Sequence, residues 1–139
     1  MPIPIEYQRA TAYFDKFMED ALIKAGLGSS HQTYTMVQGV LQTFRRRLDI
    51  KEAIMFSSVL PVILRAMFIA DWDLNEDIRL FEDYDIMIKE VQALRANHNF
   101  APETAIKDVA YALRCNIDVD AFDKVLNKLP KGAIQFWEP

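Results

Sequence analysis

Apolar residues recur along most of the chain with the spacing of amphipathic α-helices. In residues 7–25 they fall on one helical stripe, and two glycines, a residue type that often ends helices, follow at 26 and 28. The stripe consists of Ala10, Tyr13, Phe14, Phe17, Met18, Ala21, Leu22 and Ala25. No stretch of several residues alternates between apolar and polar with a period of two. The pattern therefore predicts an all-α protein without a sheet.

Local end signals predict where the following helices begin and end. Asp49 and Glu52 have the spacing of a capping box, so a short helix is expected to follow Asp49, and Asp118 is expected to cap a later helix in the same way. Pro61 suits the first turn of another helix, because the amide that proline lacks would be unpaired there. The helices expected after residues 7–25 cover residues 30–48, 49–59, 62–70, 78–96, 103–115 and 118–129, with a last short turn over 130–137.

The same stretch occurs twice, as residues 35–68 and, 69 positions later, as residues 104–137. The apolar positions coincide at this offset, among them the identical pair Val40/Val109, and five further residues are identical: Thr35/Thr104, Arg45/Arg114, Asp49/Asp118, Leu60/Leu129 and Pro61/Pro130. A fixed offset of this kind indicates a duplicated supersecondary unit. Because two copies are too few for a stable open array, we expect a single domain, residues 1–139, with repeats at about 7–72 and 78–137. Each four-helix repeat would bury the apolar face of the other in one closed helical bundle.

Several short motifs carry a resemblance to a known family. They are Tyr-Phe-Asp-Lys-Phe at 13–17, Leu-Pro at 60–61 and 129–130, Ala-Asp-Trp-Asp at 70–73 and Leu-Pro-Lys-Gly-Ala-Ile-Gln-Phe-Trp at 129–137. In combination they resemble the bacterial family catalogued as domain of unknown function 2267, over nearly the whole chain. The resemblance implies a helical, duplicated fold and brings no established reaction or ligand. The chain departs from the family pattern around Trp72, where Asp71 and Leu74 replace the glycine and proline expected there.

Composition and charge exclude several classes of protein. The net charge of −4 argues against non-specific binding of nucleic acid, which relies on Lys and Arg. The longest stretch without polar side chains, residues 59–64, is far too short to span a membrane. The first residues do not form a secretory signal, so we expect a cytoplasmic protein. Cys115 is the only cysteine, which excludes an internal disulfide, and we expect it to be a small core residue.

The acidic segment between the repeats is the sharpest candidate site. Its side-chain oxygens stand at positions 1, 3, 5 and 12 of a calcium-binding EF-hand loop, and helices are predicted on both sides. The candidate ligands are Asp71, Asp73, Asn75, Asp77 and Glu82. Against calcium, Glu76 occupies the position where such a loop usually needs glycine. The alternative, which we favour, is a solvated entry to a helix whose carboxylates suit the positive helix end.

Other residues offer less specific chemistry. Trp72 could anchor a partner at an interface, or could fold back over the junction between the repeats. The run of three arginines at 45–47 fits a structural role near the end of a helix. His31 and His98 lie ahead of the two repeats, and with one distant cysteine they do not form a zinc set. No nucleophile motif and no phosphate-binding glycine loop is present, so nothing in the sequence supports an enzyme.

These observations favour a non-catalytic binding or interaction module that recognises a protein partner or a second copy of itself, with no cofactor. Two alternatives stay open. The protein could respond to calcium through the acidic segment, or it could be an enzyme or small-ligand binder with a cavity between the repeats.

Overall fold

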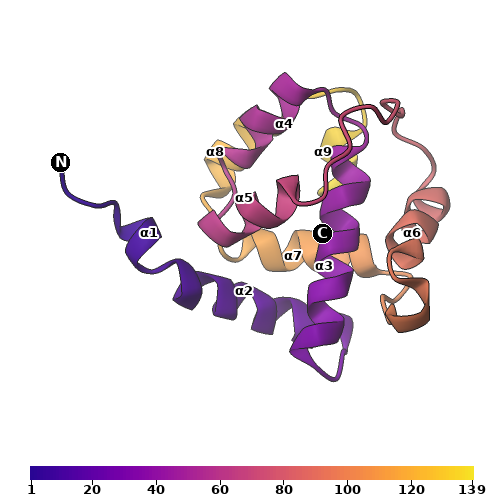
Figure 1. The fold of residues 1–139 in the computed structure, drawn as a ribbon, viewed down its shortest axis with the longest axis horizontal. Helices are drawn as coiled ribbons and strands as arrows, with labels where there is room; N and C mark the ends of the chain where they lie inside the picture. Colours follow the sequence, from indigo (N-terminus) through magenta and orange to yellow (C-terminus); the bar gives the residue numbers. More distant parts are fainter.

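The computed structural model describes residues 1–139, and every regular element is a helix (Figure 1). The first half of the chain forms α1 (Ile5–Gln8), α2 (Ala10–Ala25), α3 (Ser30–Arg45), α4 (Ile50–Ser57) and α5 (Val62–Ile69). The second half forms α6 (Tyr84–Ala93), a 3-10 turn η1 (Ala96–His98), α7 (Ala105–Arg114), α8 (Val119–Leu126) and α9 (Ala133–Phe136). The predicted all-α class is therefore confirmed.

Several helix ends have the capping contacts that the sequence predicts. The Asp49 carboxylate accepts from the amide of Glu52 at 2.8 Å, and the Glu52 side chain accepts from the amide of Asp49 at 2.9 Å, which completes the capping box of α4. The Asp118 carboxylate caps α8 by accepting from the amide of Ala121. Gly26 ends α2 in the left-handed conformation, with φ of 68°.

Two predicted helices were wrong in extent. The helix expected over residues 7–25 is interrupted at Arg9, and α1 buries no side chain, so it is oriented by the ion pair of Glu6 with Arg65 rather than by core packing. The helix expected over 78–96 begins only at Tyr84. Tertiary contacts hold the preceding residues extended: the amide of Arg79 donates to the carbonyl oxygen of Arg46 at 2.9 Å.

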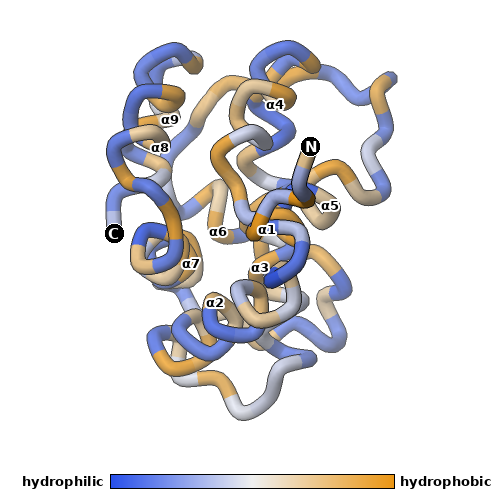
Figure 2. The backbone as a smooth tube through the Cα atoms, turned by 90° about the vertical axis from the view of Figure 1, so that its left-hand side faces the viewer, coloured by the Kyte–Doolittle hydropathy of each residue, from blue (hydrophilic) through white to orange (hydrophobic).

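The two halves of the chain pack against each other through their long helices. The first long helix of each half packs on the second long helix of the other half, so α2 lies against α7 and α3 against α6. Helices α4 and α8 also pack against each other (Figure 1). Apolar and polar residues are interspersed along each helix (Figure 2), and the apolar faces turned inward form one continuous core. The halves therefore form a single bundle.

An aromatic cluster fills the centre of this bundle. The Phe44 ring lies 4.6 Å from that of Phe56 and 5.3 Å from the indole of Trp137, measured between ring centroids. Trp137 is fully buried although it stands only two residues from the last residue. The C-terminal turn is therefore part of the core, as the apolar pattern of residues 130–137 predicts.

An arginine that donates to a backbone carbonyl oxygen recurs at the repeat offset. Arg45 donates to the carbonyl oxygen of Phe68 at 2.8 Å, and Arg114 donates to that of Trp137 at 2.9 Å. Both donor and acceptor positions are 69 residues apart. Such pairs fit a duplication, which stays a prediction. No helix of the protein is long and apolar enough to cross a membrane.

Candidate functional site

Two hollows lie where a turn of one half meets a turn of the other. The first, which we name the open groove, encloses about 280 Å³. It is lined by residues 58–62 and Arg65 of the α4–α5 region, by residues 116–118 and Ala121 of the α7–α8 region, and by Glu6 and Tyr13. The second, which we name the occupied groove, is lined by Arg47, Asp49, Glu52, Pro130, Lys131 and residues 78–81.

The two grooves are equivalent under the repeat offset. Every lining residue that the helical repeats contribute to the occupied groove stands 69 positions from a lining residue of the open groove. The pairs are Arg47/Asn116, Asp49/Asp118, Glu52/Ala121, Pro130/Pro61 and Lys131/Val62. Three of these pairs exchange a charged residue for a neutral one. The open groove is therefore the less charged of two related sites.

The occupied groove takes its name from residues 78–81, which pack along it without regular secondary structure and form one wall of the hollow that remains. The Arg79 amide donates to the carbonyl oxygen of Arg46 at 2.9 Å, and the Phe81 ring lies 5.7 Å from that of Phe44. The Arg79 guanidinium pairs with Glu82 at 3.0 Å. Backbone, aromatic and charged contacts together hold the segment in place.

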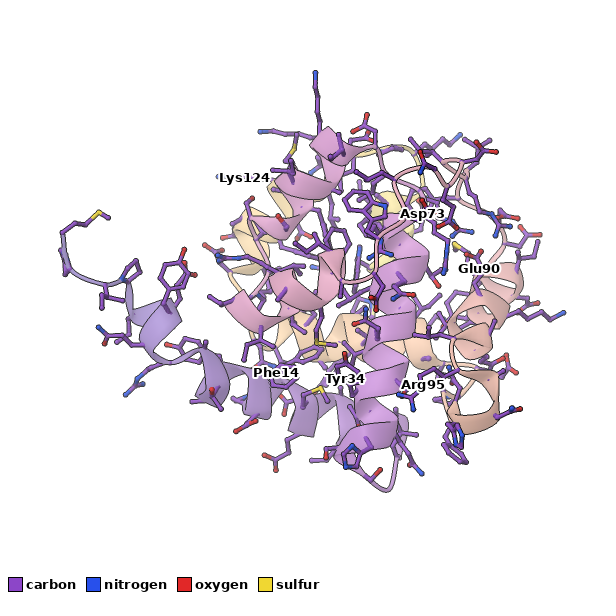
Figure 3. The ribbon with its side chains drawn as sticks, viewed as in Figure 1. Phe14, Tyr34, Asp73, Glu90, Arg95 and Lys124 are labelled. Atoms are coloured by element: carbon purple, nitrogen blue, oxygen red, sulfur yellow. The ribbon has the colours of Figure 1, made fainter.

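A buried ion network closes one side of the occupied groove. The side chain of Arg47 is fully buried, and its guanidinium donates to Glu82 and Glu90 at 2.9 Å each. Glu90 lies on the side of α6 that faces α3 (Figure 3). Burial by itself raises the pKa of Glu90, but the hydrogen bonds from Arg47 and the charges of Arg47, Arg79 and Arg46 outweigh it and hold the pKa below its ordinary value.

The open groove lacks this network. Asn116 stands at the position equivalent to Arg47, and its side-chain amide donates to Asp20 at 2.8 Å and to the carbonyl oxygen of Ala112 at 2.7 Å. Hydrogen bonds from Lys16 and then from Asn116 lower the pKa of Asp20. This arrangement ties α7 to α2 and leaves the groove itself free of buried charge.

The open groove also lacks an extended segment of the chain. Helix α2 begins at Ala10, whereas α6 begins at Tyr84, the equivalent of Asp15. The residues that would correspond to 78–81 are therefore largely in a helix and do not run along the groove. The carbonyl oxygen of Cys115, equivalent to that of Arg46, accepts no hydrogen bond from the chain. An unused backbone acceptor thus lies directly before Asn116, the first residue of the 116–118 stretch that lines the open groove.

Polar groups at the rim of the open groove are held by the chain itself. Arg65 donates through Nε to the carbonyl oxygen of Leu60 at 2.7 Å and through Nη2 to Glu6 at 2.9 Å. The hydroxyl of Ser58 donates to the carbonyl oxygen of Met55. Neither histidine lines the groove, so Ser58 has no imidazole beside it to act as a base.

The predicted acidic segment is arranged differently from an EF-hand loop. Glu82 pairs with Arg47 and Arg79, and it precedes α6 instead of lying within a helix. The Asp73 carboxylate accepts from the amide of Asn75 at 2.9 Å. No three His, Cys, Asp or Glu side chains of the protein come together as a metal-binding group. The structure leaves Asp71 and Asp77 exposed, and calcium binding stays a prediction.

Trp72, Cys115 and the histidines complete the predicted candidates. Trp72 is half-buried and folds back onto its own chain, where its ring centroid lies 5.3 Å from the guanidinium carbon of Arg45. The prediction that Cys115 is a core residue was wrong, because its position just after α7 leaves it exposed. His31 and His98 line a separate hollow together.

The sequence reasoning missed the open groove, although one signal for it was available. Comparing the repeats for charge as well as for apolar residues reveals that Glu52, Lys131 and Arg47 lose their charges in the other copy. What this comparison does not reveal is that these positions meet in space, which depends on how α4 and α8 cross.

Comparison with known proteins agrees with the fold. Residues 14–136 match the family described as "Uncharacterized conserved protein (DUF2267)", which covers the bundle from α2 to α9. No curated protein matches the chain. Because the match spans most of the chain, the protein belongs to the DUF2267 family.

Proposed function

We propose that the protein is a non-catalytic interaction module whose open groove binds an extended, apolar segment of a protein partner. The observation that carries the proposal is the occupied groove, one wall of which is formed by residues 78–81 of the chain itself, held through the amide of Arg79. A surface built twice, covered in part by such a segment in one copy and left without one in the other, indicates the kind of ligand that the open copy accepts.

The backbone of the bound segment is recognised first. The carbonyl oxygen of Cys115 takes the place of the Arg46 carbonyl, which accepts from the amide of Arg79. A partner segment that donates one amide to Cys115 would satisfy this acceptor, and extended peptides present such amides at regular spacing. Because Cys115 is exposed, the segment reaches it without opening the core.

The side chains of the segment are selected by the neutral lining. Val62 and Ala121 replace the lysine and glutamate of the occupied groove, and Val59 and Ile117 add apolar surface. Burying apolar side chains there contributes about 25 cal/mol for each Å² removed from water. Arg65 at the rim favours an acidic residue in the partner, which would compete with Glu6 for the guanidinium.

The test is a titration of isotope-labelled protein with a hexapeptide that has the sequence of residues 77–82, in reducing buffer as suits the predicted cytoplasmic location. We expect saturable amide shifts in residues 58–65 and 116–121. Ala121→Trp fills the open groove with a bulky side chain and should abolish the shifts. Lys124→Trp adds the same side chain to the outer face of the same helix (Figure 3) and should leave them unchanged.

Three results would overturn the proposal. The peptide could shift no residues of the open groove, or Ala121→Trp could bind it as well as the unsubstituted protein does. A dimer in native mass spectrometry that Ala121→Trp dissociates would assign the groove to a second copy instead of another protein.

A further inference from the structure

A further hollow, separate from both grooves, lies at the N-terminal end of α3. It encloses about 420 Å³ between the first turns of α3 and the segment after α6. We name it the cationic hollow. Its lining consists of His31, Gln32, Tyr34, Thr35, Arg95, His98 and Phe100. Figure 3 labels Tyr34 and Arg95 at this end of the molecule. The hollow therefore gathers both histidines of the protein beside an arginine.

The cationic hollow contains no carboxylate. The open groove and the occupied groove, by contrast, are each lined by at least one Asp or Glu. The contrast is informative because the chain as a whole has a net charge of −4. A site lined only by neutral and basic side chains in an acidic protein favours an anionic ligand.

The guanidinium of Arg95 has no partner in the protein. It forms no ion pair and donates no hydrogen bond, and the same holds for the imidazoles of His31 and His98. Most other arginines are paired with carboxylates or backbone carbonyls: Arg45, Arg46, Arg47, Arg65, Arg79 and Arg114. The planar guanidinium of Arg95 is thus free to bind the oxygens of a phosphate in pairs.

The loop that presents Arg95 is fixed by its own hydrogen bonds. The side-chain amide of Asn99 donates to the carbonyl oxygens of Val91 and Leu94 at 2.8 Å each, and its oxygen accepts from the amide of Ala101 at 2.9 Å. Arg95 itself has a φ of 50°, in the left-handed region. These bonds fix the backbone of the loop that carries Arg95 before a ligand arrives, which lowers the entropy cost of binding.

The facing wall supplies further donors and a flat surface. The amide of His31, a lining residue in the first turn of α3, donates to no group of the protein, because first-turn amides have no carbonyl one turn before them. The ring of Tyr34 is 42% exposed and that of Phe100 is 58% exposed. A ligand with an anionic end and a flat apolar end would contact both kinds of group.

We propose that the cationic hollow binds a small phosphomonoester that carries an aromatic ring, with Arg95 and the two imidazoles on the phosphate and Tyr34 or Phe100 against the ring. Phosphate fits because it offers three acceptor oxygens to donors that converge from two sides.

The two histidines make the test direct. They are the only ones in the chain, so the two imidazole sets of a proton NMR spectrum report on this hollow alone. Phenyl phosphate should shift both sets in a saturable manner, and inorganic phosphate should bind more weakly because it lacks the ring. Added salt should weaken both ligands.

Substitution of Arg95 provides the second arm. Arg95→Asn removes the guanidinium while keeping a residue that tolerates the left-handed backbone, and it should weaken phenyl phosphate binding by about tenfold or more. Arg9→Ala removes an arginine from the remote N-terminal segment and should leave the affinity unchanged.

The outcomes that would overturn the proposal are distinct from those for the open groove. They are an absence of saturable imidazole shifts, equal affinities for phosphate and phenyl phosphate, or an unaltered affinity in Arg95→Asn. A phosphotyrosyl hexapeptide that binds more tightly than phenyl phosphate would replace the small molecule with a phosphorylated protein.

Discussion

Gly132 is the residue that allows residues 78–81 to lie in the occupied groove. It precedes α9 with a φ of 105°, and a Cβ atom added there would stand 2.6 Å from the Cβ atom of Phe81. Real Cβ atoms do not approach other atoms so closely, so Gly132→Ala must displace either α9 or the extended segment. Gly26 offers a matched control, because its φ is 68° and no atom lies within 4 Å of the added carbon.

The two substitutions separate backbone strain from the steric clash. An alanine forced into the left-handed region costs about 1–2 kcal/mol at either site. Gly132→Ala adds an overpacking cost of about 1–3 kcal/mol from the contact with Phe81. We therefore expect the free energy of unfolding to fall by about 1 kcal/mol for Gly26→Ala and by about 3 kcal/mol for Gly132→Ala.

Urea unfolding of both variants measures this difference, provided that the slope of free energy against urea is unchanged. Hydrogen exchange at the amide of Arg79 shows whether the loss of stability involves residues 78–81, because that amide is bonded to Arg46 only while the segment lies in the groove. Exchange should accelerate in Gly132→Ala more than in Gly26→Ala. Equal destabilisation by the two variants would refute the argument that Phe81 packs against Gly132.

Four further predictions concern other parts of the bundle. Gly39→Ala should lower the free energy of unfolding by about 1–2 kcal/mol in thermal melts, because the added carbon would lie 2.8 Å from the Val91 carbonyl oxygen and outweigh the gain in helix propensity. Glu90→Gln should destabilise the protein by about 3 kcal/mol in urea at pH 7. The pKa of Glu90 in the folded protein lies below its ordinary value of 4.5, so the Glu90 carboxylate stabilises the fold above pH 4.5. This stabilisation is lost as the pH falls through the folded-state pKa, and the effect of Glu90→Gln should therefore be smaller at pH 3. Arg45→Met should cost about 2 kcal/mol in urea unfolding, since it removes two buried hydrogen bonds to carbonyls at the end of α5. The thiol of Cys115 should react with Ellman's reagent in the native protein about as fast as in urea, because it is exposed.

Each of these predictions has a control or a contradicting result. Gly28→Ala should be nearly neutral, since the nearest atom to its added carbon is 3.6 Å away. Parallel stability curves for Glu90→Gln and the unsubstituted protein between pH 7 and pH 3 would contradict the linkage to Arg47. An unchanged stability in Arg45→Met would show that water replaces the guanidinium at the carbonyls. Slow labelling of Cys115 in the native state would contradict its exposure.

The sequence by itself determined the helices and several of their ends. The capping box of Asp49 and Glu52 and the cap of Asp118 need only residues three positions apart, so they form wherever the chain folds. The apolar stripes likewise fix which face of each helix is buried, because that face depends on spacing along one helix. The repeated pattern at an offset of 69 residues predicted two related halves without any structural information.

Only the tertiary structure decided which residues share a site. Residues 78–83 have a helical pattern but lie extended, because the carbonyl of Arg46 and the ring of Phe44 hold them more favourably than a further helical turn would. His31 and His98, 67 positions apart, meet because α3 packs against α6. The open and occupied grooves arise where turns of opposite halves meet, and the path of the chain between them leaves one groove free. Local chemistry sets the elements, whereas contacts between distant residues depend on how the elements cross.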